Sequence, residues 1–202
     1  GSLARHLVAL TERESMPSSP RACIVREAQL PAECPHIDEI HKAAFEHSHR
    51  QIVGEQGSSW FDPDGKCFVA ELNGVLCGFV YVMYEEEEEK SGAEGSHEDD
   101  NGGAEGSEDI PVPYIDDLFV QPEFQRCGVG KALMHRAEDF LWTIPSLRDD
   151  DGAVKVHLAV FEVDADTQQF CKKLGWNLAG RGFKCKADGC KYVLMEKVLL
   201  SR

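Results

Sequence analysis

Two glycines, Gly128 and Gly130, stand one residue apart between an apolar stretch and a helical pattern, in the segment VQPEFQRCGVGKAL at residues 120–133. Glycine is about 1 kcal/mol less favourable than alanine inside a helix, so a pair at a helix start suggests a specific need. The first N–H groups of a helix lack intrahelical acceptors and carry partial positive charge, which suits a phosphate. The alternative is a tight turn that only lets a strand and a helix pack closely.

Two common phosphate-binding motifs do not fit this turn. A dinucleotide-binding fold carries GxGxxG after its first strand, and no third glycine falls in place here. A P-loop carries GxxxxGK[ST], but Gln125 stands at its first glycine and Ala132 at its Ser or Thr. What remains is a turn whose backbone amides at residues 126–131 wrap a pyrophosphate, with charge added by Arg126 or Lys131.

Two adjacent carboxylates, Asp116 and Asp117, precede the turn in the strand-like segment YIDDLFV at residues 114–120. Strict alternation along a strand sends successive side chains to opposite faces, so only one of the two acids is expected to face a cleft. Alternation places Tyr114, Asp116 and Leu118 on one face, and Ile115, Asp117 and Phe119 on the other.

Apolar periodicity indicates the elements that position these residues. Strands are expected at residues 22–28, 112–120 and 153–161, and helices within 31–50 and at 128–142 and 165–174. A hairpin is expected at 66–84, turning at Asn73-Gly74, because this dipeptide accepts the positive φ angles of a type I′ turn. A second hairpin is expected at 176–200. The resulting order is β-α(α)-β-β-β-α-β-α-β-β.

The net charge of −15 is concentrated in residues 85–109, where twelve acidic residues and one lysine contribute −11. This segment has too little apolar surface to offset the entropy of ordering, so we predict a disordered acidic insert; a tail that attracts cations or basic proteins is the alternative. Residues 1–20 are expected to be a flexible tail, with Gly1-Ser2 typical of a cloning scar, and 21–202 a single domain. The acidic balance argues against nucleic-acid binding, and no run of about 20 apolar residues indicates a membrane span.

The eight cysteines include no CxxC pair. Their spread is typical of free thiols in a reducing compartment, so we expect a cytoplasmic protein without a metal site. Cys185 and Cys190 flank KADG and could form a bridge or half a metal site, but two ordinary thiols are favoured.

The segment DLFVQPEFQRCGVGKAL resembles the coenzyme A pyrophosphate loop, [RQ]xxGxG/A, of the GNAT superfamily of acyl-CoA N-acyltransferases. FCKKLGW at 170–176 is similar to the FYxxxGF signature of that family, and the element order matches its fold. The resemblance implies an α+β fold, with a mixed, mostly antiparallel sheet of about seven strands and helices on both faces. YIDDLFV and HLAVFEVD are most similar to the diamine (spermidine/spermine-type) and thialysine acetyltransferases, which have a Glu-Asp pair and a His at the places of Asp116-Asp117 and His157.

The resemblance also implies roles for individual residues. Acetyl-CoA, the cosubstrate, would contact the backbone of the opened strand, the pyrophosphate turn and two places on the following helix. These residues are Leu118, Phe119 and Val120, then Gln125, Arg126, Cys127, Gly128, Val129, Gly130 and Lys131, then Asp164 and Thr167, which replace a fixed Asn and Ala. The Leu118 N–H would stabilise the carbonyl oxygen that becomes negative during transfer. Asp116 and His157 would contact the substrate, and Asp116 would attract a cationic amine and relay its proton through water; a solvated strand-edge carboxylate is the alternative.

Cys171 stands at the place of the general-acid Tyr of that family. A thiol, with an ordinary pKa of about 8.5 against about 10 for tyrosine, could protonate a departing thiolate, but its side chain is shorter. A small buried thiol that packs the helix is the favoured role. A covalent acetyl-cysteine is disfavoured, because no His or Asp lies three or four residues from Cys171. Tyr192 is the other candidate for the acid.

These observations predict an N-acetyltransferase that moves an acetyl group from acetyl-CoA to a primary amine, favouring a small cationic amine such as a polyamine. The alternatives are a protein N-terminal or lysine acetyltransferase and a catalytically impaired acyl-CoA-binding regulator. The expected partner is thus a small-molecule amine, and a homodimer is left open.

Overall fold

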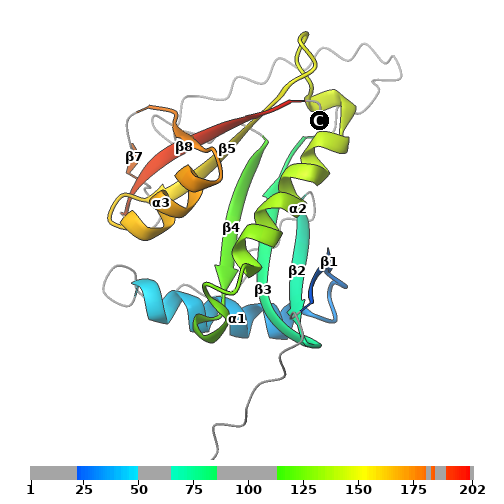
Figure 1. Cartoon of the computed structure of the whole chain (residues 1–202), viewed down its shortest axis with the longest axis vertical. Coiled ribbons are helices and arrows are strands. Elements are labelled where there is room, and N and C mark those ends of the chain that lie inside the picture. The colour runs from blue at the N-terminus through cyan, green and yellow to red at the C-terminus, as the bar shows by residue number, and fades with distance from the viewer. Residues whose placement is uncertain (1–21, 50–64, 86–112, 181–182, 185–189, 201–202) are drawn as a thin grey trace, which may run out of the picture.

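The computed structural model describes residues 22–49, 65–85, 113–180, 183–184 and 190–200 (Figure 1). The predicted tail at 1–20, the acidic insert beyond Glu85 and the Cys185 thiol lie outside the described residues. The elements in chain order are β1 (Cys23–Glu27), α1 (Cys34–His49), β2 (Lys66–Leu72), β3 (Val75–Met83), β4 (Tyr114–Val120), the short helix η1 (Pro122–Phe124), α2 (Val129–Thr143), η2 (Pro145–Leu147), β5 (Val154–Phe161), α3 (Ala165–Lys173), β6 (Asn177–Leu178), β7 (Phe183–Lys184) and β8 (Lys191–Leu199).

The described strands form one mixed sheet in the order β1-β2-β3-β4-β5-β8-β6, with β7 also paired to β8. Only β4 and β5 run parallel; the other neighbours are antiparallel. The expected α+β fold is confirmed. The sheet has one strand more than expected because the first arm of the last hairpin is divided into the short pieces β6 and β7.

The turn between β2 and β3 is the predicted one. Asn73 and Gly74 have φ angles of 57° and 77°, and Leu72 pairs directly with Val75. Two consecutive positive φ angles match the right-handed twist of a hairpin, which is why Asn-Gly is favoured there.

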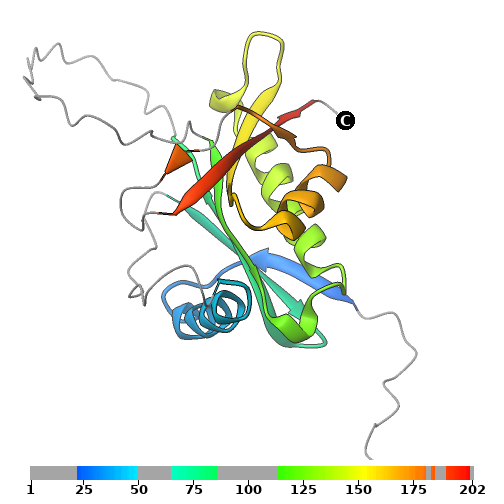
Figure 2. The ribbon, with the colours of Figure 1, turned by 90° about the vertical axis from the view of Figure 1, so that its left-hand side faces the viewer.

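Helix α1 covers one face of the sheet, and α2 and α3 cover the other (Figure 2). Beneath α2, Leu133 and Leu141 pack with Val80 and other buried residues of the sheet, and this core continues under β5 and β8. On the opposite face, Ile37 and Ile40 of α1 pack against β2 and β3. None of the described helices combines the length and the apolar character needed to cross a bilayer.

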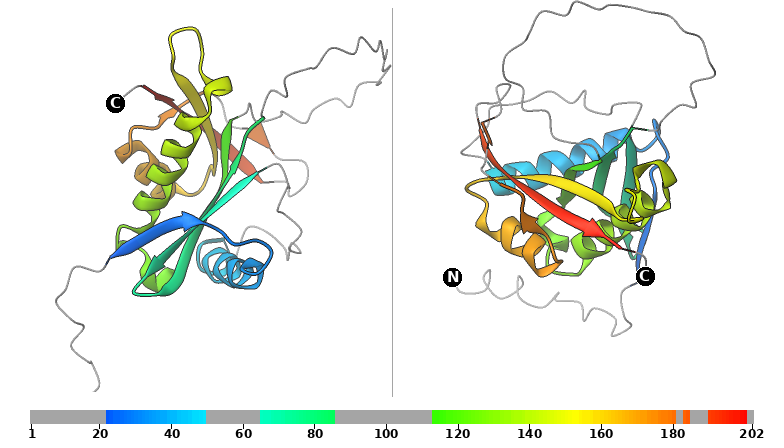
Figure 3. Two further views of the ribbon diagram at one scale, coloured as in Figure 1. Left: turned by 90° about the vertical axis from the view of Figure 1, so that its right-hand side faces the viewer. Right: turned by 90° about the horizontal axis from the view of Figure 1, so that it is seen from above.

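Strands β4 and β5 separate soon after they meet. Their parallel pairing consists of Tyr114 with His157 and Ile115 with Leu158, and the strands diverge beyond these pairs (Figure 1). β5 instead pairs with β8 along its whole length, from Val154 to Phe161. Seen from above, β5 and β8 run together, set off from β1–β3 (Figure 3).

Gly78 of β3 allows β4 and α2 to approach closely. A Cβ at this position would lie 2.9 Å from the Phe119 carbonyl oxygen and 3.1 Å from Leu133 Cδ1. We expect Gly78→Ala to lower the free energy of unfolding by about 1–3 kcal/mol, the usual cost of overpacking. Urea denaturation measures this, with Gly180→Ala as control because a Cβ there meets nothing within 4 Å. Equal stability of the two variants would contradict this account of the packing.

Candidate active site

The strand β4 contains a bulge that the sequence analysis did not foresee. Its register with β3 shifts between Val80, which pairs with Leu118, and Val82, which pairs with Ile115. Ile115 and Leu118, three residues apart, both pack into the core beneath α2. The prediction of strict alternation across this segment was therefore wrong, because a bulge adds one residue to the strand and so resets which face each side chain takes. Asp116 and Asp117 are the two residues between those core positions, and both lie outside the α2 core.

Asp116 and Asp117, adjacent in the chain, lie at the bulge, and both carboxyl groups are partly removed from water. Burial raises the pKa of Asp117 well above its usual range, and the charge of Asp116 raises it further. The surrounding protein also raises the pKa of Asp116, although its side chain reaches the surface and its shift is the smaller one. Two like charges so close disfavour simultaneous ionisation, so this pair binds a proton more readily than isolated carboxylates do. A cation placed next to the pair would restore the ionised form.

The backbone of β4 beyond the bulge points hydrogen-bond donors toward the side that β5 has left. The Gln121 N–H donates to the Cys77 carbonyl of β3 at 2.9 Å. Because N–H groups alternate along a strand, the Phe119 N–H also faces β3, while those of Leu118 and Val120 face away from it. These two donors lie where the parallel pairing with β5 has ended. The backbone contacts of Leu118, Phe119 and Val120 with acetyl-CoA stay predictions, and of their three N–H groups those of Leu118 and Val120 are free of β3.

The turn between β4 and α2 contains two left-handed residues and leads directly into the helix. Gly128, the residue before the first turn of α2, is left-handed, with φ 89° and ψ −4°, and Arg126, two residues earlier, has φ 61°. No side chain caps α2, whose first intrahelical bond runs from the Ala132 N–H to the Gly128 carbonyl at 3.0 Å. The N–H groups of residues 129–131 precede that bond, so they face outward from the helix start. Uncapped donors at a helix N-terminus suit a pyrophosphate.

Two contacts hold this turn in place. The Gln125 side-chain amide donates to the Val120 carbonyl at 3.1 Å, which ties the turn to the end of β4. A Cβ on Gly130 would lie 3.5 Å from the ring of Phe170, so α3 packs on the first turn of α2 at this glycine. Gln125 therefore positions the turn through its side chain, and Gly130 brings the two helices together.

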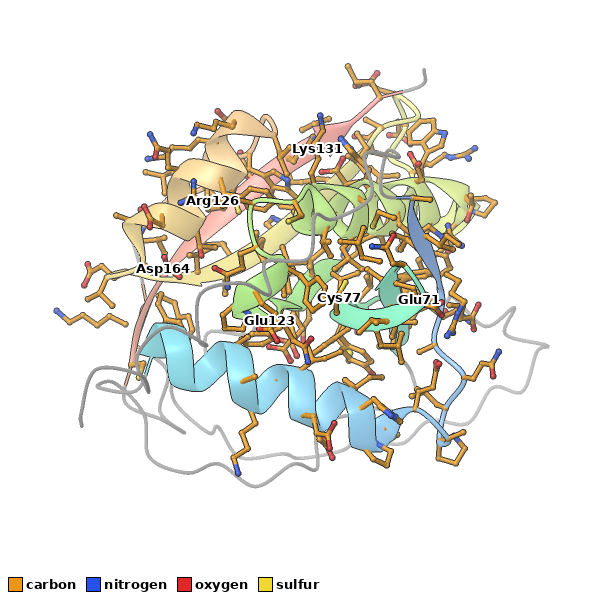
Figure 4. The ribbon with its side chains drawn as sticks, turned by 60° about the horizontal axis from the view of Figure 1, so that its bottom comes forward. Glu71, Cys77, Glu123, Arg126, Lys131 and Asp164 are labelled. Atoms are coloured by element: carbon orange, nitrogen blue, oxygen red, sulfur yellow. The ribbon has the colours of Figure 1, made fainter. Side chains whose placement is uncertain are left out.

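The charged residues near the turn come from the turn itself, from α2 and from the start of α3. Arg126, Cys127 and Lys131 are exposed, whereas Val129 is buried. Figure 4 shows Lys131 at α2, Asp164 at the start of α3 and Arg126 beside α3. The two cations are placed to add positive charge near the helix start.

His157 lies on β5 beside the point where the strands separate. Its neighbours Val156 and Leu158 pack into the α2 core, so the His157 side chain belongs to the opposite face. The side chain is 8% exposed, and its Nδ1 has no hydrogen-bond partner among the described residues. Its parallel partner on β4 is Tyr114, two residues before Asp116. The predicted substrate residues Asp116 and His157 thus come from neighbouring strands at one end of the opening between β4 and β5.

His41 of α1 is a neighbour of the opened strand that sequence reasoning missed. Its ring meets that of Phe119 edge-on, with centroids 4.7 Å apart. Burial lowers the pKa of His41 to about 4, so the ring is neutral at physiological pH. Nothing in its sequence context distinguishes it from the other histidines of the predicted helix. The contact depends on how α1 crosses the sheet.

Cys171 is enclosed in the core beneath α2. Its side chain has no exposed surface, and burial raises the pKa of the thiol to about 12. A thiol with that pKa is a poor proton donor to another thiolate. The burial therefore supports the packing role that the sequence analysis favoured for this residue.

The other two predicted residues of α3 interact with each other. The Asp164 carboxylate accepts hydrogen bonds from the Thr167 N–H at 2.9 Å and from the Thr167 hydroxyl at 2.7 Å. Asp164 thus caps α3, as Asp commonly does at a helix start. Tyr192, the other candidate acid, stacks on Phe161 with ring centroids 4.6 Å apart.

Comparison with known proteins identifies the class to which this fold and turn belong. The acetyltransferase (GNAT) family matches residues 30–176. A comparison with curated proteins gave no match. The ribosomal-protein-S18-alanine N-acetyltransferase of Escherichia coli is similar at 15% identity with a TM-score of 0.58, and the match covers 90% of this chain and 96% of that one. Arabidopsis thaliana Naa50, in complex with the bisubstrate analogue CoA-Ac-MVNAL, is similar at 13% identity with a TM-score of 0.57, over 87% of this chain and 97% of that one. The spermidine/spermine N-acetyltransferase SpeG of Vibrio cholerae is similar at 15% identity with a TM-score of 0.55, over 87% of this chain and 93% of that one.

The chain belongs to the GNAT acetyltransferase family and is an acetyl-CoA-dependent N-acetyltransferase. Identities this low show a shared fold and do not carry a substrate from any neighbour. The residues present fit acetyl-CoA, because the α2 start is uncapped and β4 directs two N–H groups toward the side that β5 has left. The described residues contain no cluster of side chains that could hold a metal ion.

The raised pKa of Asp117 predicts how stability depends on pH. A carboxyl whose pKa is higher in the folded than in the unfolded state favours folding at low pH, and this contribution is lost as the pH rises from about 4 through the folded pKa. We expect Asp117→Asn to melt at nearly the same temperature as the parent near pH 4, and at a progressively higher one toward neutral pH. Asp150→Asn, on an exposed turn, is the matched control. A difference that shrinks with rising pH would contradict the assignment.

Proposed function

We propose that the acceptor of the acetyl group is a small cationic amine such as a polyamine or a lysine-like molecule. The observation that carries this proposal is the bulge in β4, which leaves both Asp116 and Asp117 outside the α2 core beside the separation of β4 and β5. A pair of carboxyl groups with raised pKa values attracts a cation strongly, because the cation removes their mutual repulsion.

The chemistry requires the attacking amine to be neutral, so its ammonium proton must first leave. Asp116, exposed next to Asp117, is the proposed group that binds the ammonium and relays that proton through water. His157 supplies a buried nitrogen, Nδ1, without a partner among the described residues, and an imidazole nitrogen is able to exchange a hydrogen bond with an amine. Both groups thus favour an amine that arrives charged and reacts neutral.

Acetyl-CoA supplies the thioester whose carbonyl carbon the amine nitrogen attacks, and the bond from that carbon to sulfur breaks. The Leu118 N–H, which faces away from β3, is the proposed donor to the carbonyl oxygen as negative charge develops there. The uncapped N–H groups of residues 129–131, with Arg126 and Lys131, hold the pyrophosphate. Holding both reactants in line accounts for much of the acceleration in such a site.

The departing thiolate takes up one proton, for which two side chains were candidates. The full burial of Cys171 and its pKa of about 12 disfavour this thiol as the donor. Tyr192 is the alternative, and Tyr192→Phe removes its proton without removing the ring that stacks on Phe161.

For the location of the protein in the cell, we propose a reducing compartment, the cytoplasm, on the spacing of the cysteines alone.

An acceptor panel tests the proposed function. Polyamines, free amino acids and peptides are offered with acetyl-CoA, and the release of the CoA thiol is followed. We expect turnover with polyamines or lysine-like amines, and a KM for the acceptor that rises as the pH falls, because the carboxyl pair then holds a proton. Asp116→Asn should raise this KM roughly tenfold to a hundredfold, as expected for a lost charged hydrogen bond of about 1.5–3 kcal/mol. The KM for acetyl-CoA should change little.

Asp150→Asn is the control for the loss of one negative charge far from the site. Turnover with peptides alone would contradict the proposal and favour a protein N-terminal or lysine acetyltransferase. Binding of CoA without turnover of any amine would also contradict it and would favour an acyl-CoA-binding regulator.

A further inference from the structure

The sheet is divided into two parts that share few of its hydrogen bonds. β1–β4 form one part and β5, β6, β7 and β8 the other. Within the described residues, the two parts meet in the sheet through the pairs Tyr114–His157 and Ile115–Leu158 and through the His157 N–H, which donates to the Pro113 carbonyl at 3.0 Å. Because this junction lies at one end of β4, it alone does not determine how far the strands diverge at the other end.

A buried polar cluster joins the two parts at a second place. Glu138 of α2, which follows β4, is 2% exposed. Its carboxylate accepts from the Lys197 ammonium of β8 at 2.8 and 2.9 Å, and from the Trp176 indole N–H at 3.1 Å. The same ammonium donates to the Leu174 carbonyl, just beyond α3, at 2.8 Å. We call Glu138, Lys197, Trp176 and the Leu174 carbonyl the clamp.

The hydrogen bonds of the clamp depend on the relative orientation of the elements that they join, whereas the apolar contacts of the surrounding core do not. Apolar side chains beneath α2 contact β5, β8 and Cys171, but apolar contacts fix no particular angle between elements. A buried carboxylate is stable only when paired and fully hydrogen-bonded, so Glu138 and the partly buried Lys197 ammonium favour one arrangement of α2, β8 and the end of α3. His135, whose Nδ1 is 3.6 Å from Glu138, adds a further polar group on the same side of α2.

The position of α3 matters for acetyl-CoA. Phe170 of α3 packs at Gly130, in the first turn of the helix whose N-terminus is the pyrophosphate site. The clamp holds α3 just beyond its C-terminal end, through the carbonyl of Leu174 and through Trp176. Two contacts about one helical turn apart, at Phe170 and Leu174, thus tie the C-terminal half of α3 to α2.

We propose that the clamp sets the opening between β4 and β5, and that Glu138 and Lys197 are positioning residues for acetyl-CoA. They touch neither reactant. They act by holding α3 and β8 at one distance from α2, so that the β4 backbone and the α2 N-terminus can engage the same cofactor. This proposal rests on the acetyl-CoA part of the function above and is independent of the identity of the acceptor.

Four variants separate positioning from simple stability. Glu138→Gln and Lys197→Met each break the clamp, and the double variant Glu138→Leu with Lys197→Met replaces it with apolar groups. Replacing both members of a buried ion pair with apolar residues commonly preserves or raises stability, whereas removing one member lowers it. Leu141→Ala, one turn beyond Glu138 and fully buried, destabilises α2 and leaves every hydrogen bond of the clamp in place. For each protein, the Tm, the Kd for CoA by calorimetry, kcat, and the KM for both substrates are measured.

We expect the single variants to weaken CoA binding roughly twofold to thirtyfold, the usual range for residues that couple two sites, with a smaller change in kcat. The double variant should recover the Tm and still bind CoA weakly. Leu141→Ala should lower the Tm and keep the affinity of the parent. Recovery of both Tm and affinity in the double variant, or an equal loss of affinity in Leu141→Ala, would overturn the proposal.

The double variant keeps the test decisive if a single variant does not fold. Binding of CoA by the parent protein distinguishes failure of the clamp proposal from failure of the acetyl-CoA site. If the parent binds CoA and the clamp variants bind it equally well, the clamp proposal falls and the acetyl-CoA site stands. If the parent itself does not bind CoA, the site on which the proposal rests falls with it.

Discussion

The backbone hydrogen bonds of β4 are the constraint on which the rest of the site depends. On one side, β4 is paired with β3 from Tyr114 to Val120, interrupted by the bulge. On the other, pairing with β5 ends at Ile115. Backbone N–H groups need partners, so a strand in the middle of a sheet with one free side requires water or a ligand there. A ligand with its own amides and carbonyls, such as the arm of coenzyme A, satisfies that requirement.

The same strand concentrates unfavourable charge. Without the bulge, Asp116 and Asp117 would point to opposite faces and interact weakly. With it, their pKa values are raised, chiefly by burial, and the charge of one carboxylate raises the pKa of the other. Such an arrangement lowers the stability of the folded protein at neutral pH and is typical of functional sites. The clamp, on the α2 side of the sheet, also costs free energy because it removes the Glu138 carboxylate from water. Its hydrogen bonds to Lys197 and Trp176, and that of Lys197 to the Leu174 carbonyl, offset this cost.

Features with a local cause could be predicted from the sequence. The Asn73-Gly74 turn and the left-handed Gly128 follow from backbone preferences of those residues, and the helices follow from apolar spacing. The bulge could not, because only the register with β3 reveals the extra residue. The bond from Lys197 to Glu138 spans 59 residues, and neither side chain has a distinctive local pattern. The sequence analysis favoured a buried Cys171, as the structure shows, but it did not predict that Asp164 caps α3.

Residue-resolved amide exchange by NMR, with and without CoA, tests the central claim most directly. Three consecutive amides on β4 form an internal comparison, because the Phe119 N–H faces β3 while those of Leu118 and Val120 face away from it. We expect the Leu118 and Val120 amides to exchange quickly in the free protein and to become protected when CoA binds. The Phe119 amide should be protected in both states. Fast exchange at Leu118 and Val120 in the saturated complex, or protection of both amides before CoA is added, would contradict it.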